Sequence, residues 1–321
     1  MNEILDKLRE YAKLNNKNVF TKEELLEIIG RDGMHALLKW DCLEDEGENQ
    51  YKFSEYKVEG TLLGAITGDI VGSVYEFDNI KTKDFELFKN DCEFTDDTVL
   101  TVAIAEALTK YNPENEEEFK ENLIDTFHKY GEMYPDVGYG GHYLYWIENK
   151  LRKPYNSCGN GSAMRTSAVG WYAKTIEECE RIAKLCAEVT HNHPDGIAGA
   201  QATAGVIFLA KNGATKDELK VYVEKYYSVD FTLDEIRPTY DYEIVNKTTV
   251  PQAFRCFYEA TDFEDTIRNA ISIGGDSDTL AAIAGSMAEA YYGIPEDIKE
   301  TALSFLDSYL VSILEGFRVN T

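Results

Sequence analysis

The stretch Val58–Val74, VEGTLLGAITGDIVGSV, is the pattern in this chain that indicates most about its fold. Its glycines stand at positions 60, 64, 68 and 72, one every four residues, and therefore share roughly one face of a helix. Glycines spaced in this way also occur in membrane dimers, but this run has only 17 residues and includes Glu59 and Asp69. The spacing therefore predicts a buried helix whose glycine face lies close to its neighbours.

Helical periodicity extends through most of the chain beyond this stretch. Residues 99–108 are largely apolar, and residues 182–189 repeat their apolar side chains every three to four positions. Similar segments occur near 115–130, 162–174, 196–211, 250–273, 279–292 and 296–317. Alternating strand patterns are nearly missing, and the best candidate is the short segment Tyr51–Phe53. We therefore expect an all-α fold, a compact domain of many helices.

The charge of the chain limits its partners. With 321 residues, 58 acidic and 32 basic side chains, the formal net charge is −26, and 44% hydrophobic residues are ample for a packed core. Duplex nucleic acid and anionic membranes both require a concentrated basic surface, so neither is expected as a main partner. A phosphate-bearing ligand is expected only where a metal or a local basic patch makes the electrostatic potential positive.

The cysteines and the N-terminal segment indicate in which cellular compartment the protein is expected. The six cysteines are scattered without a CxxC pair, which is typical of reduced thiols inside a cell. The N-terminal MNEILDKLREYAK is charged and amphipathic and lacks the apolar core of a signal peptide. We therefore expect a cytoplasmic protein.

Residues 1–57 differ from the rest in their sequence pattern. They are predicted to be a separate N-terminal extension, and the main domain is predicted to cover residues 58–321. The extension holds two short amphipathic helices, near 2–14 and 21–30, then an acidic run at 44–49 and the candidate strand. This order resembles a winged helix. Its 9 basic and 13 acidic residues give a net charge of 9 − 13 = −4, which suits DNA poorly. Two roles for this extension remain open: it contacts or regulates another protein, or it has a purely structural role.

Oxygen-rich residues stand directly before two of the apolar helices. The first cluster is Thr95-Asp96-Asp97-Thr98, just before Val99. The second is Asp276-Ser277-Asp278-Thr279, which follows a pair of glycines and precedes Leu280. Asp and Thr are good N-caps, so helix capping is one interpretation of either cluster alone. Two carboxylates in each cluster exceed what a cap requires.

Together the two clusters favour a metal site. They offer carboxylate and hydroxyl oxygens and no His or Cys, which is the ligand set that suits Mg²⁺ or Mn²⁺ rather than Zn²⁺. Four nearby carboxylates would repel one another strongly without cations. We therefore predict a site for one or two divalent metals, which could polarise a substrate oxygen and activate water.

Three polar loops are candidates for ligand contacts. Residues 156–165, NSCGNGSAMR, could present backbone N–H groups to a phosphate, although such a string is more often a turn with a helix cap. Residues 190–196, THNHPDG, suggest substrate contact or loop hydrogen bonds rather than zinc, because no further ligand lies at suitable spacing. In the turn at 138–141, Tyr139 either lines a pocket or packs on the surface, and the surface is favoured.

Five segments, taken in order, resemble the ADP-ribosylglycohydrolase family. They are GDIVGSVYEF (68–77), FTDDT (94–98), GNGSAMR (159–165), THNHPDG (190–196) and GGDSDTLAAIAG (274–285). The family includes the hydrolases that remove ADP-ribose from dinitrogenase reductase and the eukaryotic ADP-ribosyl-acceptor hydrolases. The resemblance spans about residues 58–318 and implies a compact all-α domain with a binuclear Mg²⁺ or Mn²⁺ centre.

The resemblance assigns roles motif by motif. Glu76 resembles a mobile acidic residue that reaches the metals or the ribose, and Asp97 and Glu76 are the candidate bases. The implied metal ligands are Thr95, Asp96, Asp97, Asp276, Asp278 and Thr279. The implied substrate-binding residues are Glu76, Ser157, Gly159, Asn160, Gly161, Ser162 and His191.

The implied activity is metal-dependent hydrolysis that removes ADP-ribose from an acceptor, mono-ADP-ribosyl-arginine on a protein being the first choice. The cleaved bond is at the anomeric carbon of the ribose, where oxocarbenium-like charge develops. The expected partners are an ADP-ribosylated protein and ADP-ribose, and the expected state is a monomer. Two alternatives stay open. One is an immunity or regulatory protein that blocks an ADP-ribosylating toxin through residues 1–57, and the other is an inactive homologue that binds ADP-ribose.

Overall fold

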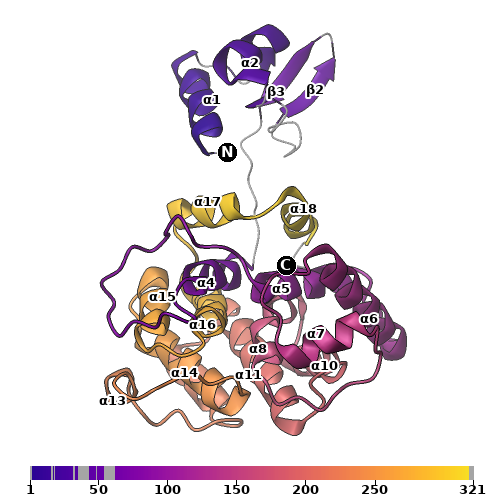
Figure 1. Cartoon of the computed structure of the whole chain (residues 1–321), viewed down its shortest axis with the longest axis vertical. Coiled ribbons are helices and arrows are strands. Elements are labelled where there is room, and N and C mark those ends of the chain that lie inside the picture. The colour runs from indigo at the N-terminus through magenta and orange to yellow at the C-terminus, as the bar shows by residue number, and fades with distance from the viewer. Residues whose placement is uncertain are drawn as a thin grey trace. The chain divides into compact units, whose positions relative to one another are not determined.

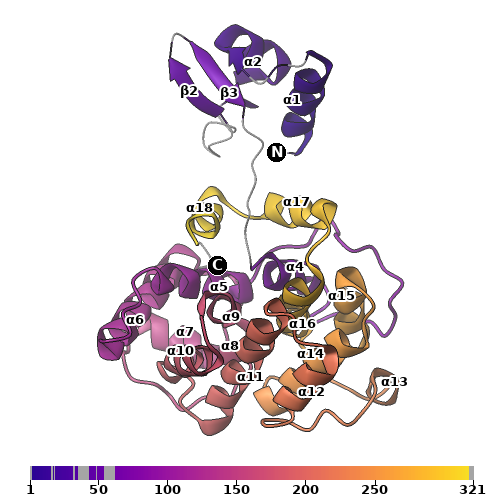
Figure 2. The same cartoon turned by 180° about the vertical axis from the view of Figure 1, so that it is seen from behind.

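The computed structural model describes residues 2–15, 17, 19–31, 33–34, 43–47, 49–53 and 62–317 (Figures 1 and 2). By contacts the chain divides into two compact units, Met1–Glu59 with Leu306–Ser312 and Gly60–Phe305 with Ile313–Thr321. The predicted boundary between residues 57 and 58 falls outside the described ranges and stays a prediction. The expectation of an all-α main domain is confirmed.

The first unit is a small mixed structure with its own core. Its elements are α1 (Asn2–Asn15), β1 (Val19–Thr21), α2 (Lys22–Ile28), β2 (Leu43–Gly47) and β3 (Gln50–Phe53). The strands form an antiparallel sheet in the order β1-β3-β2. Buried apolar side chains, including Leu8, Phe20 and Leu25, form one cluster within this unit. The sequence pattern indicated only the strand at 51–53, because β2 coincides with the acidic run and lacks apolar alternation. A winged-helix assignment stays a proposal.

The second unit is built of helices, and Figures 1 and 2 show α4 and α16 side by side within it. The helices before the centre of the chain are α4 (Leu63–Ser73), α5 (Asp96–Leu108), α6 (Glu116–Met133), α7 (Gly141–Glu148), α8 (Gly161–Met164) and α9 (Ser167–Tyr172). The next are α10 (Ile176–Glu188), α11 (Pro194–Lys211), α12 (Lys216–Val223), α13 (Leu233–Ile236) and α14 (Asn246–Glu259). The last are α15 (Phe263–Ser272), α16 (Ser277–Tyr292) and α17 (Glu296–Phe305). The helix α18 (Ser308–Gly316) follows, and its residues up to Ser312 are grouped with the first unit.

Three of the helical segments that the periodicity predicts are each two helices. The segment at 250–273 divides into α14 and α15 because the Asp262 side chain accepts a hydrogen bond from the backbone N–H of Asp265 and starts a new helix. The segment at 296–317 divides in the same way at Asp307, whose carboxylate accepts from the N–H of Tyr309 and of Leu310. The segment at 162–174 divides into α8 and α9. Apolar periodicity misses these breaks because it continues across them.

The glycine face of α4 packs against α16, as its spacing predicts. A Cβ atom on Gly64 would lie 2.3 Å from the Gly285 carbonyl oxygen, and one on Gly68 would lie 2.0 Å from the Ala281 carbonyl oxygen. A Cβ atom on Gly72 would lie 2.3 Å from Cα of Asp278, at the start of α16. The two backbones therefore approach more closely than any side chain would permit, and this packing brings Asp69 of α4 to the second acidic cluster.

Glu289 of α16 holds the first turn of α4. One of its carboxylate oxygens accepts hydrogen bonds from the backbone N–H of Leu62, at 3.0 Å, and of Gly64, at 2.9 Å. These bonds satisfy N–H groups that have no partner inside the helix. Burial nevertheless dominates and raises the pKa of Glu289 to about 7.

We expect Gly68→Ala to lower the free energy of unfolding by about 3 kcal/mol, because the new methyl group meets the backbone of α16 and only a shift of the helix would relieve the clash. Chemical denaturation measures this directly. Gly316→Ala is the matched control, since nothing lies within 4 Å of a Cβ atom there and the backbone is not left-handed. Equal stability of the two variants would contradict the packing argument.

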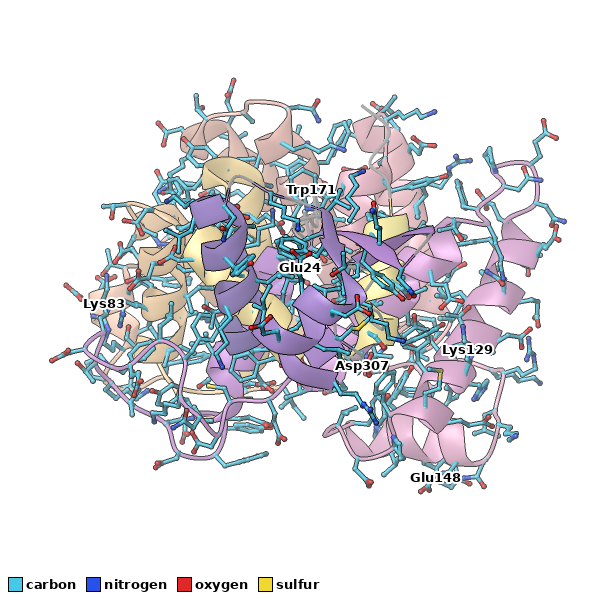
Figure 3. The ribbon with its side chains drawn as sticks, turned by 90° about the horizontal axis from the view of Figure 1, so that it is seen from above. Glu24, Lys83, Lys129, Glu148, Trp171 and Asp307 are labelled. Carbon is cyan, nitrogen blue, oxygen red and sulfur yellow. The ribbon has the colours of Figure 1, made fainter. Side chains whose placement is uncertain are left out.

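The surface carries much of the charge. Lys83, Lys129 and Glu148 lie at the perimeter in Figure 3, while the core of the helical unit is apolar. Among the described cysteines, Cys92, Cys158, Cys179, Cys186 and Cys256 are all free thiols. No helix in the described ranges is both long and apolar enough to cross a membrane.

Candidate active site

A cavity of about 300 Å³ in the helical unit collects nearly all the residues that the sequence singled out. The predicted residues that line it are Glu76, Thr95, Asp96, Asp97, Ser157, Gly159, Asn160, Gly161, His191, Asp276, Asp278 and Thr279. They come from five separate stretches of the chain, so only the tertiary fold brings them together. Other lining residues include Tyr143, Tyr155, Met164, Arg165, Tyr242 and Ile244.

Ser162 is the predicted substrate-binding residue that does not line this cavity. It is 1% exposed, and its hydroxyl donates to the Gly196 carbonyl at 2.7 Å and accepts from Asn246 Nδ2 at 2.9 Å. It therefore holds the loop that carries the other predicted residues. Its place in the sequence motif gave no indication of which way the hydroxyl points.

The first acidic cluster opens α5 and is held by Asp69. Thr95 caps the helix, with its hydroxyl 3.4 Å from the backbone N of Asp97, so the capping interpretation is correct for this residue. Asp69 accepts hydrogen bonds from the Thr95 hydroxyl at 2.6 Å, the Thr95 N–H at 2.9 Å and the Thr98 N–H at 3.0 Å. Because the Thr95 proton is committed to Asp69 and only one lone pair of its oxygen faces the Asp97 N–H, the second lone pair remains available.

The second acidic cluster opens α16. Gly274 and Gly275 precede it in left-handed conformations, with φ of 68° and 84°, which side chains other than glycine rarely adopt. Asn160 Nδ2 donates to Asp276 at 2.7 Å. The Thr279 hydroxyl donates to Asp97 at 3.2 Å and so joins the two clusters.

Carboxylate oxygens from these elements converge. One oxygen each from Asp69, Asp97 and Asp278 lies within 4.8 Å of the others, and the same holds for Glu76, Asp276 and Asp278. Asp278 therefore belongs to both groups. Asp96 lines the same cavity and repels Asp97, but neither of these two groups includes it.

Burial and mutual repulsion govern the charge of the cluster. Desolvation raises the pKa of Asp97 well above its usual range, and repulsion from Asp69, Asp96 and Asp276 raises it further. The pKa values of Asp96 and Asp278 are raised in the same way, first by burial and then by neighbouring carboxylates. So many carboxylates in one buried place are unfavourable unless protons or cations neutralise them.

The residues fit divalent cations. Asp97 Oδ1 is buried and has no hydrogen-bond partner among the described residues. The convergent donors are all carboxylate and hydroxyl oxygens, which are the ligands that Mg²⁺ and Mn²⁺ prefer. An acidic cluster with an unsatisfied buried oxygen, whose aspartates form no ion pair among the described residues, is therefore suited to hold such ions.

Glu76 lines the cavity but is only partly buried, unlike Asp97, Asp276 and Asp278. Desolvation raises its pKa to about 7, a hydrogen bond from the Tyr242 hydroxyl at 2.9 Å opposes that rise, and repulsion from Asp276 adds to it. A carboxyl group with such a pKa exchanges protons readily near neutral pH. The Tyr242 ring stacks on that of Phe77, which is 85% exposed, with 6.1 Å between ring centroids.

The loop at 157–161 is fixed by a second segment. Its backbone pairs with the segment at 244–246: Asn160 N–H donates to the Ile244 carbonyl at 2.9 Å, and Asn246 N–H donates to the Cys158 carbonyl at 3.1 Å. The Asn246 side chain, fully buried, also donates to the Gly159 carbonyl at 2.9 Å. The loop is therefore pre-arranged before any ligand binds.

His191 is a neutral imidazole facing this loop. Arg165 Nη2 donates to the Thr190 hydroxyl at 2.7 Å, and that hydroxyl lies 2.8 Å from His191 Nδ1. This contact fixes the orientation of the ring. Burial, with repulsion from Arg165, holds the pKa of His191 well below its usual range. A Cβ atom on Gly161 would lie 3.3 Å from Nε2, so this nitrogen is beside the loop.

The structure adds residues to the candidate site that the sequence patterns do not indicate. Asp69 lies in the motif GDIVG, where its sequence context shows only a charge within a helix, and Tyr242 has no local pattern around it. Arg165 ends its motif, is 1% exposed, and its guanidinium lies 4.6 Å from the Phe127 ring. Tyr139 is buried, 8% exposed, against Tyr143, so the surface interpretation is wrong. Arginine between aromatic rings is a signal that only the fold reveals.

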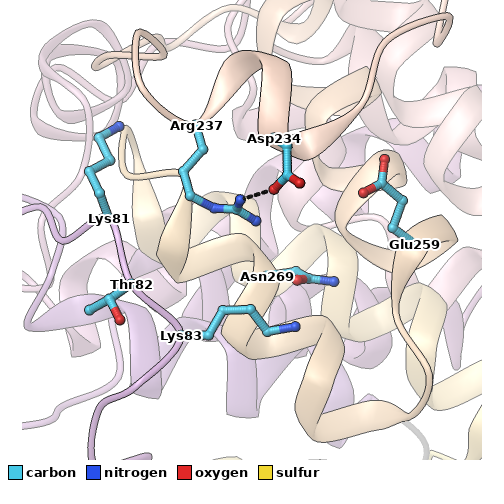
Figure 4. Close-up of a pocket in the computed structure, with 7 residues that line it drawn as sticks. All are labelled: Lys81, Thr82, Lys83, Asp234, Arg237, Glu259 and Asn269. Atoms are coloured by element: carbon cyan, nitrogen blue, oxygen red, sulfur yellow. Dashed lines mark hydrogen bonds and ion pairs between the residues drawn. The ribbon is translucent and has the colours of Figure 1, made fainter.

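A second cavity, of about 370 Å³, lies elsewhere in the helical unit (Figure 4). It is lined by Lys81, Thr82, Lys83, Asp234, Arg237, Glu259 and Asn269. Its basic groups already have partners, since Arg237 pairs with Asp234 and Lys83 with Asp265. The acidic cavity is therefore the better candidate for catalysis.

Comparison with known proteins agrees with this geometry. Residues 52–314 match the family model described as ADP-ribosylglycohydrolase. The chain is 26% identical to the ADP-ribosylhydrolase ARH3 of Mus musculus, over 78% of this chain and 88% of the relative. It is 24% identical to the ADP-ribosylarginine hydrolase Tri1 of Pseudomonas putida (strain GB-1), over 77% of this chain and 75% of the relative.

One solved structure shows the same fold. A chain of an "ADP-ribosylglycohydrolase-related protein complex" superimposes with a TM-score of 0.58 at 21% identity. The match covers 80% of this chain and 96% of the other. At this identity the likeness concerns the fold alone.

Proposed function

This chain belongs to the ADP-ribosylglycohydrolase family, and from that premise we propose that it hydrolyses the bond between ADP-ribose and a modified acceptor. The observation that carries the proposal is the convergence of Glu76 and the two aspartate clusters in one cavity beside a pre-arranged glycine loop. Such a cavity offers acid–base groups at one end and donors for an anionic ligand at the other.

We propose two Mg²⁺ or Mn²⁺ ions as cofactors, held by Thr95, Asp96, Asp97, Asp276, Asp278 and Thr279. When bound, they would neutralise the carboxylates, attract the anionic ligand and polarise the reacting sugar. The two sets of converging carboxylates, which have Asp278 in common, support two cation positions rather than one. Asp69 would act behind them, by keeping the Thr95 proton turned away.

The protein's own groups perform the remaining steps. The backbone of the loop at 157–161 and the His191 imidazole bind and orient the diphosphate and ribose. Glu76 takes a proton from the water that attacks the anomeric carbon while the bond to the acceptor breaks and the sugar acquires positive charge. That proton then passes to the leaving acceptor. Asp97 is the alternative base. The pKa of Glu76, raised to about 7, suits that exchange at neutral pH.

Arginine on a protein is the acceptor that we propose. The exposed Phe77 ring stacks on the Tyr242 ring, whose hydroxyl donates to the Glu76 carboxylate in the cavity lining. A planar guanidinium stacks on aromatic rings and pairs with carboxylates, so this arrangement favours it over a serine hydroxyl. The name of the Tri1 relative, an ADP-ribosylarginine hydrolase, supports the same choice.

The test is release of free ADP-ribose from a protein mono-ADP-ribosylated on arginine, with Mg²⁺ or Mn²⁺ present. We expect the wild type to release it, Asp276→Asn to release at least about 100-fold less, and a serine-linked conjugate to be a poorer substrate. No release from arginine, serine or nucleic-acid conjugates would overturn the proposal. Faster release from serine would retain the activity and reject the arginine acceptor.

The proposal extends to a cytoplasmic monomer that needs no partner besides its substrate. The alternative in which residues 1–57 bind an ADP-ribosylating toxin predicts a stable complex with that toxin which survives Asp276→Asn. An inactive homologue would bind ADP-ribose and release nothing. Gel filtration and the release assay distinguish these cases.

A further inference from the structure

Asn79 makes hydrogen bonds to both sides of the candidate active site. Its Nδ2 lies within hydrogen-bond distance of the backbone carbonyls of Tyr75, at 2.6 Å, and of Glu76, at 3.0 Å, in the segment 74–95, which we call the Glu76 loop. The same nitrogen is 2.9 Å from the Gly275 carbonyl, so its two hydrogens are shared among three acceptors. Asn79 Oδ1 accepts from the Gly275 N–H at 2.6 Å. Gly275 directly precedes Asp276, so one side chain binds the backbones that carry two of the converging carboxylates.

Lys81 makes a parallel connection two residues later. Its Nζ donates to the carbonyl of Ile273, before the glycine pair, and to the carbonyl of Tyr240 at 2.6 Å. Tyr240 lies two residues before Tyr242, the hydrogen-bond donor to Glu76. Lys81 stands at the edge of the second cavity, apart from the Asp234–Arg237 pair (Figure 4).

The glycine pair makes room for these two side chains. A Cβ atom on Gly274 would lie 2.8 Å from Lys81 Nζ and 2.9 Å from Asn79 Oδ1. A Cβ atom on Gly275 would lie 2.6 Å from Cε1 of Tyr240. The two glycines are therefore required by the contact with Asn79 and Lys81 as well as by their left-handed backbone.

Side-chain bonds are what hold the Glu76 loop. Residues 74–95 contain neither helix nor strand, so no backbone ladder fixes them. Of the side chains in this segment, Asn79 and Lys81 are those that donate directly to the backbone around the Gly274–Gly275 turn. Supporting bonds of this kind orient ligand groups and typically change metal affinity or activity by 10- to 100-fold when they are removed.

We propose that Asn79 and Lys81 are positioning residues that set the separation between Glu76 and Asp276, and with it the geometry of the metal and ribose site. This inference rests on the proposed function for its kinetic readout. The two residues act through the backbone, and neither lines the acidic cavity. Their removal therefore changes the rate and the metal affinity rather than the recognition of substrate.

The test compares full-length wild type with Asn79→Ala and Lys81→Met. We expect each variant to bind Mn²⁺ roughly 10-fold more weakly by titration calorimetry, and kcat to fall by a similar factor while KM changes little. Lys81→Arg, which keeps a donor and the charge, should recover part of the loss. Lys83→Met is the matched control, because Lys83 lies on the same segment but pairs with Asp265.

Mn²⁺ affinity and kcat within twofold of wild type in Asn79→Ala would overturn the inference, and so would a lower melting temperature with both quantities unchanged. Circular dichroism at the assay temperature shows that each variant is folded. If the wild type binds Mn²⁺ but releases no ADP-ribose, the proposed function fails and the Mn²⁺ affinities still decide the positioning role. If the wild type binds no Mn²⁺, both ideas fail.

Discussion

Asp278→Asn is expected to reduce ADP-ribose release by roughly 10³-fold, because Asp278 is the carboxylate that both converging groups share. The substitution removes one charge and one oxygen donor at the point where two cation positions meet. Release of ADP-ribose and Mn²⁺ titration measure the effect. The matched control is Asp234→Asn, whose side chain is 90% exposed in the second cavity and which should retain wild-type activity.

The same variant should be more stable than wild type when chelator removes all divalent ions. Burial and repulsion raise the pKa of Asp278 above 3.8, so the folded state holds protons that the unfolded state releases. Stability of the metal-free wild type therefore falls as pH rises above about 4, and removing this carboxyl flattens that fall. Thermal melts at pH 5 and pH 8, with and without Mn²⁺, give the comparison. A variant that is less stable than wild type at pH 8 in chelator would contradict the repulsion argument.

Glu76→Gln is expected to lower kcat by roughly 10³-fold while the affinity for ADP-ribose changes little. Glutamine keeps the shape and an acceptor for Tyr242 but cannot take a proton, and general base catalysis commonly contributes a factor of that order. Single-turnover release and calorimetric ADP-ribose binding separate the two quantities. An unchanged kcat would assign the base to Asp97 instead.

Tyr242→Phe is the companion variant for Glu76. The tyrosine hydroxyl stabilises the charged carboxylate and so lowers its pKa, against the larger effect of burial. Removing the Tyr242 hydroxyl therefore raises the pKa of Glu76 further. In a plot of kcat against pH, the rise in rate that reports deprotonation of Glu76 should move to higher pH. A rise that stays at the same pH would show that Glu76 does not act as the base.

Local patterns in the sequence predicted the helical class well. The glycine spacing of Val58–Val74 identified α4 as a buried helix, and the oxygen-rich residues before Val99 and Leu280 identified the starts of α5 and α16. They did not predict the break at Asp262 or the strand at 43–47, because capping and pairing compete with apolar periodicity at those places.

Two clusters of hard oxygen donors, a glycine loop and a histidine, in the order typical of one family, can be recognised from the sequence alone. Which of these oxygens meet depends on the tertiary structure, because distances between motifs depend on helix packing and not on spacing along the chain. The close contact of α4 with α16 brings Asp69 to Asp97 and Asp278, and it is invisible in any single motif. The pKa of Glu76 and the inward turn of Ser162 likewise follow from burial, which a sequence does not specify.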